Sequence, residues 1–222
     1  PMLEWFEEKR SFTPHPGQMQ VVEAINNGAH EIDICCGKRS GKSLLAMEVA
    51  LYRVLGLSQR VWIMGPTWDI VDRIWRPMWG EIRKDGIPIT DRQKESRLIR
   101  TANGGLLEGV SWASPEQIEG EGVHVVITDE SQYLTQDIYD KIRARLVGDW
   151  LWLRIGSPAE GGMSFYEDNA FAEELANRPG HVGPIRWPTW LNPCPEVQET
   201  VRIELDTLEF LKESRGANDP AY

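Results

Sequence analysis

The sequence has few cysteines, no long apolar run and a deficit of basic residues. Its three cysteines, at positions 35, 36 and 194, suit neither a disulfide framework nor the spacing of a zinc site. No stretch of 18 apolar residues occurs, and the acidic residues 4–8 do not resemble a signal peptide. We therefore expect reduced thiols, no membrane association and a soluble, cytoplasmic protein.

The charge is strongly negative, at −10 from 34 acidic and 24 basic residues. A negative field opposes the approach of nucleic acid, so any contact with DNA needs a local basic patch. The chain has 222 residues, of which 41% are hydrophobic and 26% charged, and it has no internal repeat. This composition excludes disordered and collagen-like proteins and allows one sizeable core with an appended subdomain.

A phosphate-binding loop, Cys-Gly-Lys-Arg-Ser-Gly-Lys-Ser, occupies residues 36–43. It lies between an apolar strand-like run at 32–35 and a helix-forming run at 44–51, so the amide groups of the helix N-terminus are available to an anion. In the pattern G-x-x-x-x-G-K-[ST], the lysine reaches the β- and γ-phosphates and the hydroxyl holds Mg²⁺. Lys42 and Ser43 fit these two roles.

The first half of the loop departs from the pattern. Cys36 stands where the first glycine belongs, Gly37 follows one place later, and Lys38 and Arg39 add two cations. Because the strand, loop and helix follow in the required order, we still predict a nucleotide site. Its candidate loop residues are Gly37, Lys38, Arg39, Ser40, Gly41, Lys42 and Ser43.

Strand and helix patterns alternate through the first 160 residues. Strands are expected at 32–35, 60–64, 123–128 and 150–155, and helices at 19–27, 67–84 and 136–146. This alternation is typical of an α/β fold with a mainly parallel central sheet and helices on both faces. Asn103-Gly104 between two apolar runs predicts a hairpin, which would add antiparallel strands at one sheet edge.

The character of the chain changes after residue 160. Proline and tryptophan become frequent, and two acidic helices are expected at 165–177 and 195–212. We therefore expect a nucleotide-binding core at 1–160, followed at 161–222 by a small lid subdomain and a truncated linker.

An acidic pair, Asp129 and Glu130, follows the apolar strand expected at 123–128. After such a strand, the aspartate can order the Mg²⁺ shell together with Ser43, and the glutamate can activate the attacking water. Small GTPases use a glutamine for this last task, so ATP is the better candidate than GTP. The two motifs together predict Mg²⁺-dependent hydrolysis of ATP, with Lys42, Lys38, Arg39 and Glu130 as catalytic candidates.

Four segments together resemble the ATPase motor domain of tailed-bacteriophage large terminases. They are Pro-His-Pro-Gly-Gln at 14–18, the phosphate loop, Ile-Thr-Asp-Glu-Ser at 127–131 and Gly-Ser-Pro at 156–158. The resemblance implies a P-loop NTPase of the ASCE/RecA-like class. It also implies a motor that pumps double-stranded viral DNA into a procapsid in the host cytoplasm.

The resemblance has consequences for partners and domains. It implies the portal protein and the small terminase subunit as partners, and a ring of identical subunits during packaging. Large terminases carry a nuclease domain after the ATPase, and the sequence has no acidic cluster that could supply one. We therefore expect an isolated ATPase fragment without nuclease activity, compatible with a monomer.

Three roles are carried over from the family by position. Gln18 matches the glutamine that reads the adenine edge, with an exposed loop amide as the alternative. Lys38 and Arg39 match a basic position that senses or stabilises the γ-phosphate, although one of them could face solvent. Ser157 matches the coupling motif, with a plain turn hydroxyl as the alternative.

The trans-acting arginine of many terminases has no counterpart at its expected place, where this sequence has Glu119. A carboxylate cannot stabilise the charge that develops on the phosphoryl group. Arg73, Arg143 and Arg145 are therefore the alternative candidates.

Surface contacts with DNA are harder to assign. The densest basic stretch contains Arg92, Lys94, Arg97 and Arg100, joined by Arg83 and Lys84, and it is either a phosphate-contacting patch or a charged edge strand. Among the ten tryptophans, those at 68, 187 and 190 lie outside the regular core patterns.

Two other functions fit the motifs. A helicase-like ATPase shares the glutamine motif and the acidic pair, but it needs a second domain of similar size. A nucleotide-dependent binding switch would bind ATP with little turnover, and Glu130 argues against it.

Overall fold

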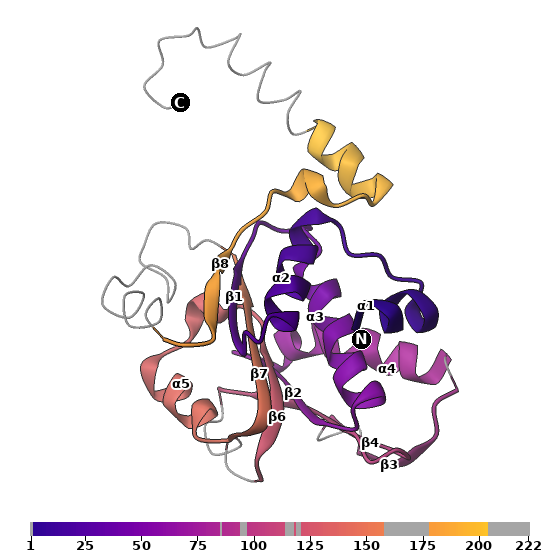
Figure 1. Cartoon of the computed structure of the whole chain (residues 1–222), viewed down its shortest axis with the longest axis vertical. Coiled ribbons are helices and arrows are strands. Elements are labelled where there is room, and N and C mark those ends of the chain that lie inside the picture. Colours follow the sequence, from indigo (N-terminus) through magenta and orange to yellow (C-terminus); the bar gives the residue numbers. More distant parts are fainter. Residues whose placement is uncertain are drawn as a thin grey trace, which may run out of the picture.

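A single mixed sheet organises the chain. The computed structural model describes residues 2–84, 86–93, 97–113, 118, 121–157 and 178–203. These residues form an eight-stranded sheet in the order β3-β4-β5-β2-β6-β7-β1-β8 (Figure 1). The strands are β1 Glu31–Cys35, β2 Arg60–Gly65, β3 Ile89–Gln93, β4 Leu98–Thr101, β5 Leu106–Ser111, β6 Val123–Thr128, β7 Leu146–Gly156 and β8 His181–Ile185.

Most of the sheet is parallel. Strands β5, β2, β6, β7, β1 and β8 pair in parallel, whereas β4 pairs antiparallel with β5 and β3 antiparallel with β4. The hairpin between β4 and β5 turns at Asn103 and Gly104, and Gly104 has a φ of +92° that favours glycine. The mainly parallel sheet with an antiparallel edge addition is thus confirmed.

Helices cover both faces of the sheet. They are α1 Met2–Trp5 with the π-turn η1 Phe6–Arg10, α2 Pro16–Asn26, α3 Lys42–Leu51 with the π-turn η2 Tyr52–Gly56, α4 Trp68–Lys84 and α5 Gln136–Arg143. Residues 195–203 are also helical. The helix expected at 136–146 ends earlier, because β7 begins at Leu146. The helix expected at 165–177 lies outside the described residues.

Two apolar cores lie on opposite faces of the sheet. Helices α2, α3 and α4 pack on one face, and α5 packs on the other (Figure 1). Alternation along β2 shows the division, because Val61 and Ile63 belong to the first core and Trp62 and Met64 to the second. Burying a strand on both faces explains its nearly continuous apolar sequence.

The order of the strands brings three chemical motifs together. Strand β7 lies between β1 and β6, and all three run parallel. The carboxyl ends of adjacent parallel strands meet at one edge, where open α/β sheets bind ligands. The phosphate loop after β1, Ser157 after β7 and Asp129 after β6 therefore lie side by side.

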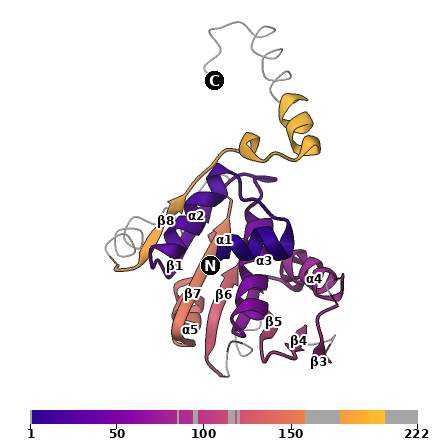
Figure 2. The ribbon, with the colours of Figure 1, turned by 45° about the vertical axis from the view of Figure 1, so that its right-hand side comes forward.

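Strand β8 extends the sheet from a part of the chain expected to form a lid. It pairs with β1 and lies beside α2 (Figures 1 and 2). The division of the chain at residue 160 stays a prediction, but the described sheet includes residues on both sides of it. No helix within the described ranges is long and apolar enough to cross a membrane.

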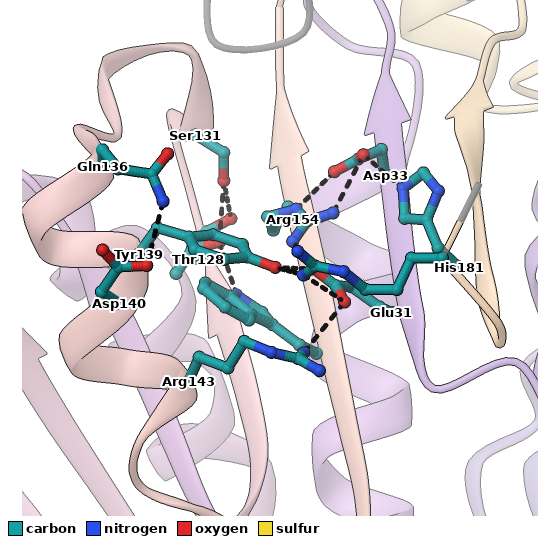
Figure 3. Close-up of polar contacts among 12 residues, drawn as sticks. Glu31, Asp33, Thr128, Ser131, Gln136, Tyr139, Asp140, Arg143, Arg154 and His181 are labelled. Atoms are coloured by element: carbon teal, nitrogen blue, oxygen red, sulfur yellow. Dashed lines mark hydrogen bonds and ion pairs between the residues drawn. The ribbon is translucent and has the colours of Figure 1, made fainter. Parts of the chain in front are cut away.

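A buried ionic cluster joins β1, β7 and β8 on the face covered by α5 (Figure 3). The guanidinium of Arg154 is fully buried between Asp33, at 2.5 Å, and Glu31. Tyr139 donates a hydrogen bond to Glu31, and His181 contacts Asp33 at 2.8 Å. Burial is the largest influence and would raise the pKa of Glu31 and Asp33, but the charge of Arg154 and the hydrogen bonds from Arg154, Tyr139 and His181 together outweigh it and lower both pKa values.

The Arg154→Met variant is expected to lose about 3–5 kcal/mol of unfolding free energy, because it leaves Glu31 and Asp33 buried without their main counter-charge. Urea unfolding measures the loss. Arg76→Met is the matched control, since Arg76 is exposed and its ion pair with Asp72 is worth about 0–1 kcal/mol. Equal stability of the two variants would contradict the structural role of the cluster.

Candidate functional site

The phosphate loop turns sharply before it enters α3. Arg39 and Gly41 both have left-handed backbone conformations, with φ values of +61° and +86°. Lys42 is the first residue of α3, and its Nζ donates to the carbonyl of Gly37 at 3.2 Å. The positive end of α3 and the ammonium group of Lys42 therefore lie in the same loop, as an anion site requires.

A cleft of about 970 Å³ opens between this loop and the ends of β2, β6 and β7. Eight residues named from the sequence line it, namely Lys38, Arg39, Lys42, Ser43, Arg73, Asp129, Glu130 and Ser157. Four further residues complete the lining, namely Pro66, Ile70, Gln132 and Tyr133. Motifs that are distant in the sequence thus share one cleft.

Asp129 is buried at the end of β6, and its Oδ1 accepts a hydrogen bond from the amide of Glu130 at 2.9 Å. Burial raises the pKa of Asp129 to about 6, although this hydrogen bond and the nearby charges of Lys42 and Arg73 oppose the rise. A cation bound at the carboxylate would favour its ionised form.

Glu130 has a left-handed conformation, with a φ of +55°, and its side chain is part of the cleft lining. Its two carboxylate oxygens have different partners: Arg73 donates to Oε1 at 3.0 Å, and Gln132 donates to Oε2 at 2.5 Å. Gln132 in turn accepts a hydrogen bond from the amide of Ser157 at 3.2 Å. Glu130 is therefore connected through one side chain to the end of β7.

The oxygen ligands in the cleft fit Mg²⁺. Ser43 supplies a hydroxyl and Asp129 a carboxylate, and Mg²⁺ is typically bound through one or two carboxylates together with waters and substrate phosphates. The described residues hold no cluster of three or more metal-ligating His, Cys, Asp or Glu side chains. The donor set thus suits a metal shared with a nucleotide better than a metal held by protein alone.

Gln18 and the loop residue Ser40 are buried and do not line the cleft. The amide group of Gln18 donates to the carbonyl of Gly41 at 2.9 Å and accepts from the backbone of His15 at 3.1 Å. A side chain at Gly37 would press against the hydroxyl of Thr189. The assignment of Gln18 to adenine stays a prediction.

The segment that follows β8 contacts the phosphate loop along its length. The indole of Trp187 donates to the Ser40 carbonyl at 2.7 Å, Thr189 donates to the Lys38 carbonyl at 3.1 Å and Asn192 donates to the Arg39 carbonyl at 2.7 Å. The side chain of Arg39 also donates to Thr200 at 2.9 Å. Residues 187–200 thus hold three successive carbonyls of the loop, although they lie far from it in the sequence.

The thiol of Cys36 points away from the cleft. Its sulfur accepts a hydrogen bond from the backbone amide of Trp187 at 3.3 Å, and the side chain is buried. Burial raises the pKa of this thiol to about 11.

We expect iodoacetamide at pH 8 to label Cys36 roughly 100-fold more slowly than the partly exposed Cys194, because thiolates are the reactive form. ATP should not change the rate at Cys36. Peptide mass spectrometry after timed labelling measures both cysteines in one sample. Labelling of Cys36 that ATP suppresses would place the thiol against the nucleotide.

Comparison with known proteins gives one consistent result. No family model matches the chain. The large terminase subunit of Escherichia phage T5 is 24% identical over 124 residues, which cover 55% of this chain and 28% of the T5 protein. The large terminase ATPase domain of Thermus phage P74-26 aligns with a TM-score of 0.59 at 18% identity, covering 98% of this chain and 92% of that chain.

A second large terminase, from a thermophilic bacteriophage and solved in complex with ADP, aligns with a TM-score of 0.65 at 14% identity, covering 85% of this chain and 49% of that chain. This nucleotide-bound terminase has also been solved with ATP-γ-S. The chain has the fold of a large-terminase ATPase domain. The family resemblance predicted from the motifs is therefore confirmed, and the chain spans 28% of the T5 subunit and about half of the nucleotide-bound terminase.

Within this terminase fold, the three arginine candidates differ in position. Arg73 lines the cleft of its own chain, whereas Arg143 pairs with Glu31 and lies over the ring of Trp150. Arg145 donates to the Ile118 carbonyl. The expected position of the terminase arginine, at Glu119, lies outside the described residues.

The basic stretch near the hairpin between β4 and β5 is only partly exposed. Arg97 forms an ion pair with Asp72 at 2.6 Å and lies over the ring of Trp68, so its charge is already used. Arg100 is exposed. Lys94 and the side chain of Arg92 lie outside what the structure describes.

Sequence patterns missed three contributions to the site. Gln132 and Tyr133 follow the acidic pair in the short turn η4 Ser131–Tyr133, and the 64% exposure of Tyr133 is unusual for a tyrosine. Their proximity to Glu130 was the available signal. Trp187 stood out only as a tryptophan outside the core patterns, because its importance arises from a contact with Ser40, which is 147 residues away.

Proposed function

We propose that this chain is the ATP-hydrolysing motor part of a phage large terminase, which uses ATP and Mg²⁺ to move double-stranded DNA into a procapsid. The observation that carries the proposal is that Lys42, Asp129 and Glu130 line one cleft, at the carboxyl ends of the parallel strands β1 and β6. Similarity to terminases in sequence and fold supports it. The ADP and ATP-γ-S complexes of the nucleotide-bound terminase support ATP as the ligand.

The phosphate loop would hold the triphosphate. Lys42 would contact the β- and γ-phosphates, and the helix N-terminus would supply amide donors. Ser43 and Asp129 would hold Mg²⁺, which neutralises the phosphate charge when bound. Lys38 and Arg39 line the same cleft, so they would stabilise charge on the transferred phosphoryl group.

Glu130 would act as the general base. It would accept a proton from the water that attacks the γ-phosphate, and its carboxylate keeps free lone pairs beside its bonds to Arg73 and Gln132. The link from Gln132 to the Ser157 amide would pass the state of the cleft to the end of β7, which is the coupling role proposed for Ser157.

DNA, the portal protein and the small terminase subunit are the proposed partners, in a ring of identical subunits located in the host cytoplasm. Because the chain has a net charge of −10, DNA would contact a local patch that includes Arg100. The patch would make DNA binding weaken steeply with salt.

Phosphate release with Mg²⁺-ATP, measured with and without double-stranded DNA, tests the proposal. We expect turnover that EDTA abolishes and that double-stranded DNA increases, with no unwinding of a fluorescent duplex. ATP binding without turnover would contradict the motor and indicate a switch. Unwinding of the duplex would instead indicate a helicase.

A further inference from the structure

Three buried side chains, His15, Gln18 and Trp187, form a loop clamp behind the phosphate loop. We infer that the loop clamp orients the loop for its anion, and that Gln18 serves phosphate binding rather than recognition of adenine. This inference rests on the proposed function, because it concerns the same nucleotide site and changes only which part of the nucleotide Gln18 serves.

Both ends of the Gln18 amide are occupied by protein. The nitrogen donates a hydrogen bond to the Gly41 carbonyl at 2.9 Å, and the oxygen accepts one from the backbone amide of His15 at 3.1 Å. Gln18 is 2% exposed and is not among the residues that line the cleft. The amide keeps one N–H and one lone pair beside these bonds, but it could reach a base only by leaving its buried position, which would break the bonds to the loop and to His15.

The other two residues of the loop clamp meet at the Ser40 carbonyl. The ring Nδ1 of His15 accepts hydrogen bonds from the backbone amides of Gly17, at 3.1 Å, and of Gln18. This nitrogen therefore carries no proton. The Nε2 must therefore carry the hydrogen, and it donates to the Ser40 carbonyl at 3.1 Å. The indole of Trp187 donates to the same oxygen at 2.7 Å.

These contacts with carbonyls also fix the direction in which the following amide groups of the loop point, because trans peptides are planar. In a trans peptide the carbonyl and the following N–H point in opposite directions. Holding the Ser40 and Gly41 carbonyls on the side of the loop clamp therefore turns the amides of Gly41 and Lys42 to the other side of the loop. That side is the cleft, which Lys42 and Ser43 line.

The packing of the loop clamp leaves little room for adjustment. A side chain at Gly17 would collide with the Trp187 indole, and the His15 ring meets that indole edge to face, with centroids 5.8 Å apart. The left-handed Gly41 has the Gln18 amide as its nearest neighbour. The loop is thus oriented before any ligand binds, and this preorganisation favours any polyphosphate, whatever its base.

Binding of ATP, GTP and inorganic tripolyphosphate to the Gln18→Met variant tests the inference. Methionine keeps the volume but removes both hydrogen bonds. We expect the Kd to rise by the same factor, about five- to tenfold, for all three ligands, with the ratio of ATP to GTP affinity unchanged. Gln20→Met, on the exposed face of the same helix, should bind all three as the wild type does.

The Trp187→Phe variant provides an independent measurement, because it removes only the donor to Ser40 and keeps an aromatic ring against Gly17. This variant should also weaken the binding of tripolyphosphate, whereas Trp190→Phe, at an exposed position, should not. Loss of ATP affinity alone in Gln18→Met, with tripolyphosphate unaffected, would overturn the inference and restore the adenine role. A wild-type protein that binds none of the three ligands would overturn the proposed function itself.

Discussion

The Glu130→Gln variant is expected to bind ATP with nearly native affinity and to hydrolyse it roughly 10²–10⁴-fold more slowly, because a general base contributes a factor of that size. Glutamine keeps the length of the side chain and can still accept the hydrogen bond from Arg73. It cannot accept a proton from water. Fluorescent-nucleotide titration and phosphate release on the same sample separate binding from turnover.

Glu121→Gln is the matched control for this experiment, since Glu121 is exposed and pairs with Arg60 away from the cleft. It should leave both measurements unchanged. Normal turnover in Glu130→Gln would contradict the assignment of Glu130 as the general base and would indicate that another carboxylate has this role.

The Lys42→Ala variant is expected to lose ATP affinity by about 100-fold or more, since hydrogen bonds to charged groups contribute about 1.5–3 kcal/mol each. The fold should persist, because the only described hydrogen bond of the ammonium group is to the Gly37 carbonyl in an exposed part of the loop. Isothermal titration with ATP-γ-S measures the loss.

Lys141→Ala removes a lysine from the surface of α5 and serves as the control for net charge. The two variants have the same charge, so a deficit confined to Lys42→Ala isolates the local contact. Equal affinities would mean that the triphosphate binds elsewhere.

The central sheet and the acidic half of the site were predictable, because both arise from local patterns. Apolar strands with loops at their carboxyl ends predict a parallel sheet, and parallel strands place Lys42 and Asp129 at one edge. The antiparallel edge was predictable for a similar reason, since Asn103-Gly104 favours a tight turn.

Two elements were not predictable from local patterns. Strand β8 contains Gly183 and Pro184, which are rare in strands, and only its pairing with β1 makes it one. The start of β7 contains Gly148 and Asp149, which disfavour strands, yet Leu146 pairs with Val123 of β6. In both cases tertiary pairing overrides intrinsic propensity.

Gln18 shows what its motif predicts and what it leaves open. The motif places the residue correctly next to the phosphate loop. Which partner its amide takes depends on the depth of burial and on Trp187, and neither is visible near residue 18.

The distance in sequence between the phosphate loop and Trp187 also determines when the site can form. Cys36 and Ser40 receive their contacts from a residue synthesised 151 and 147 positions later. At a translation rate of about 5–20 residues per second, the nascent loop waits roughly 7–30 s for its partner. The contacts between Trp187 and the loop can therefore form only after almost the entire described sequence has been synthesised.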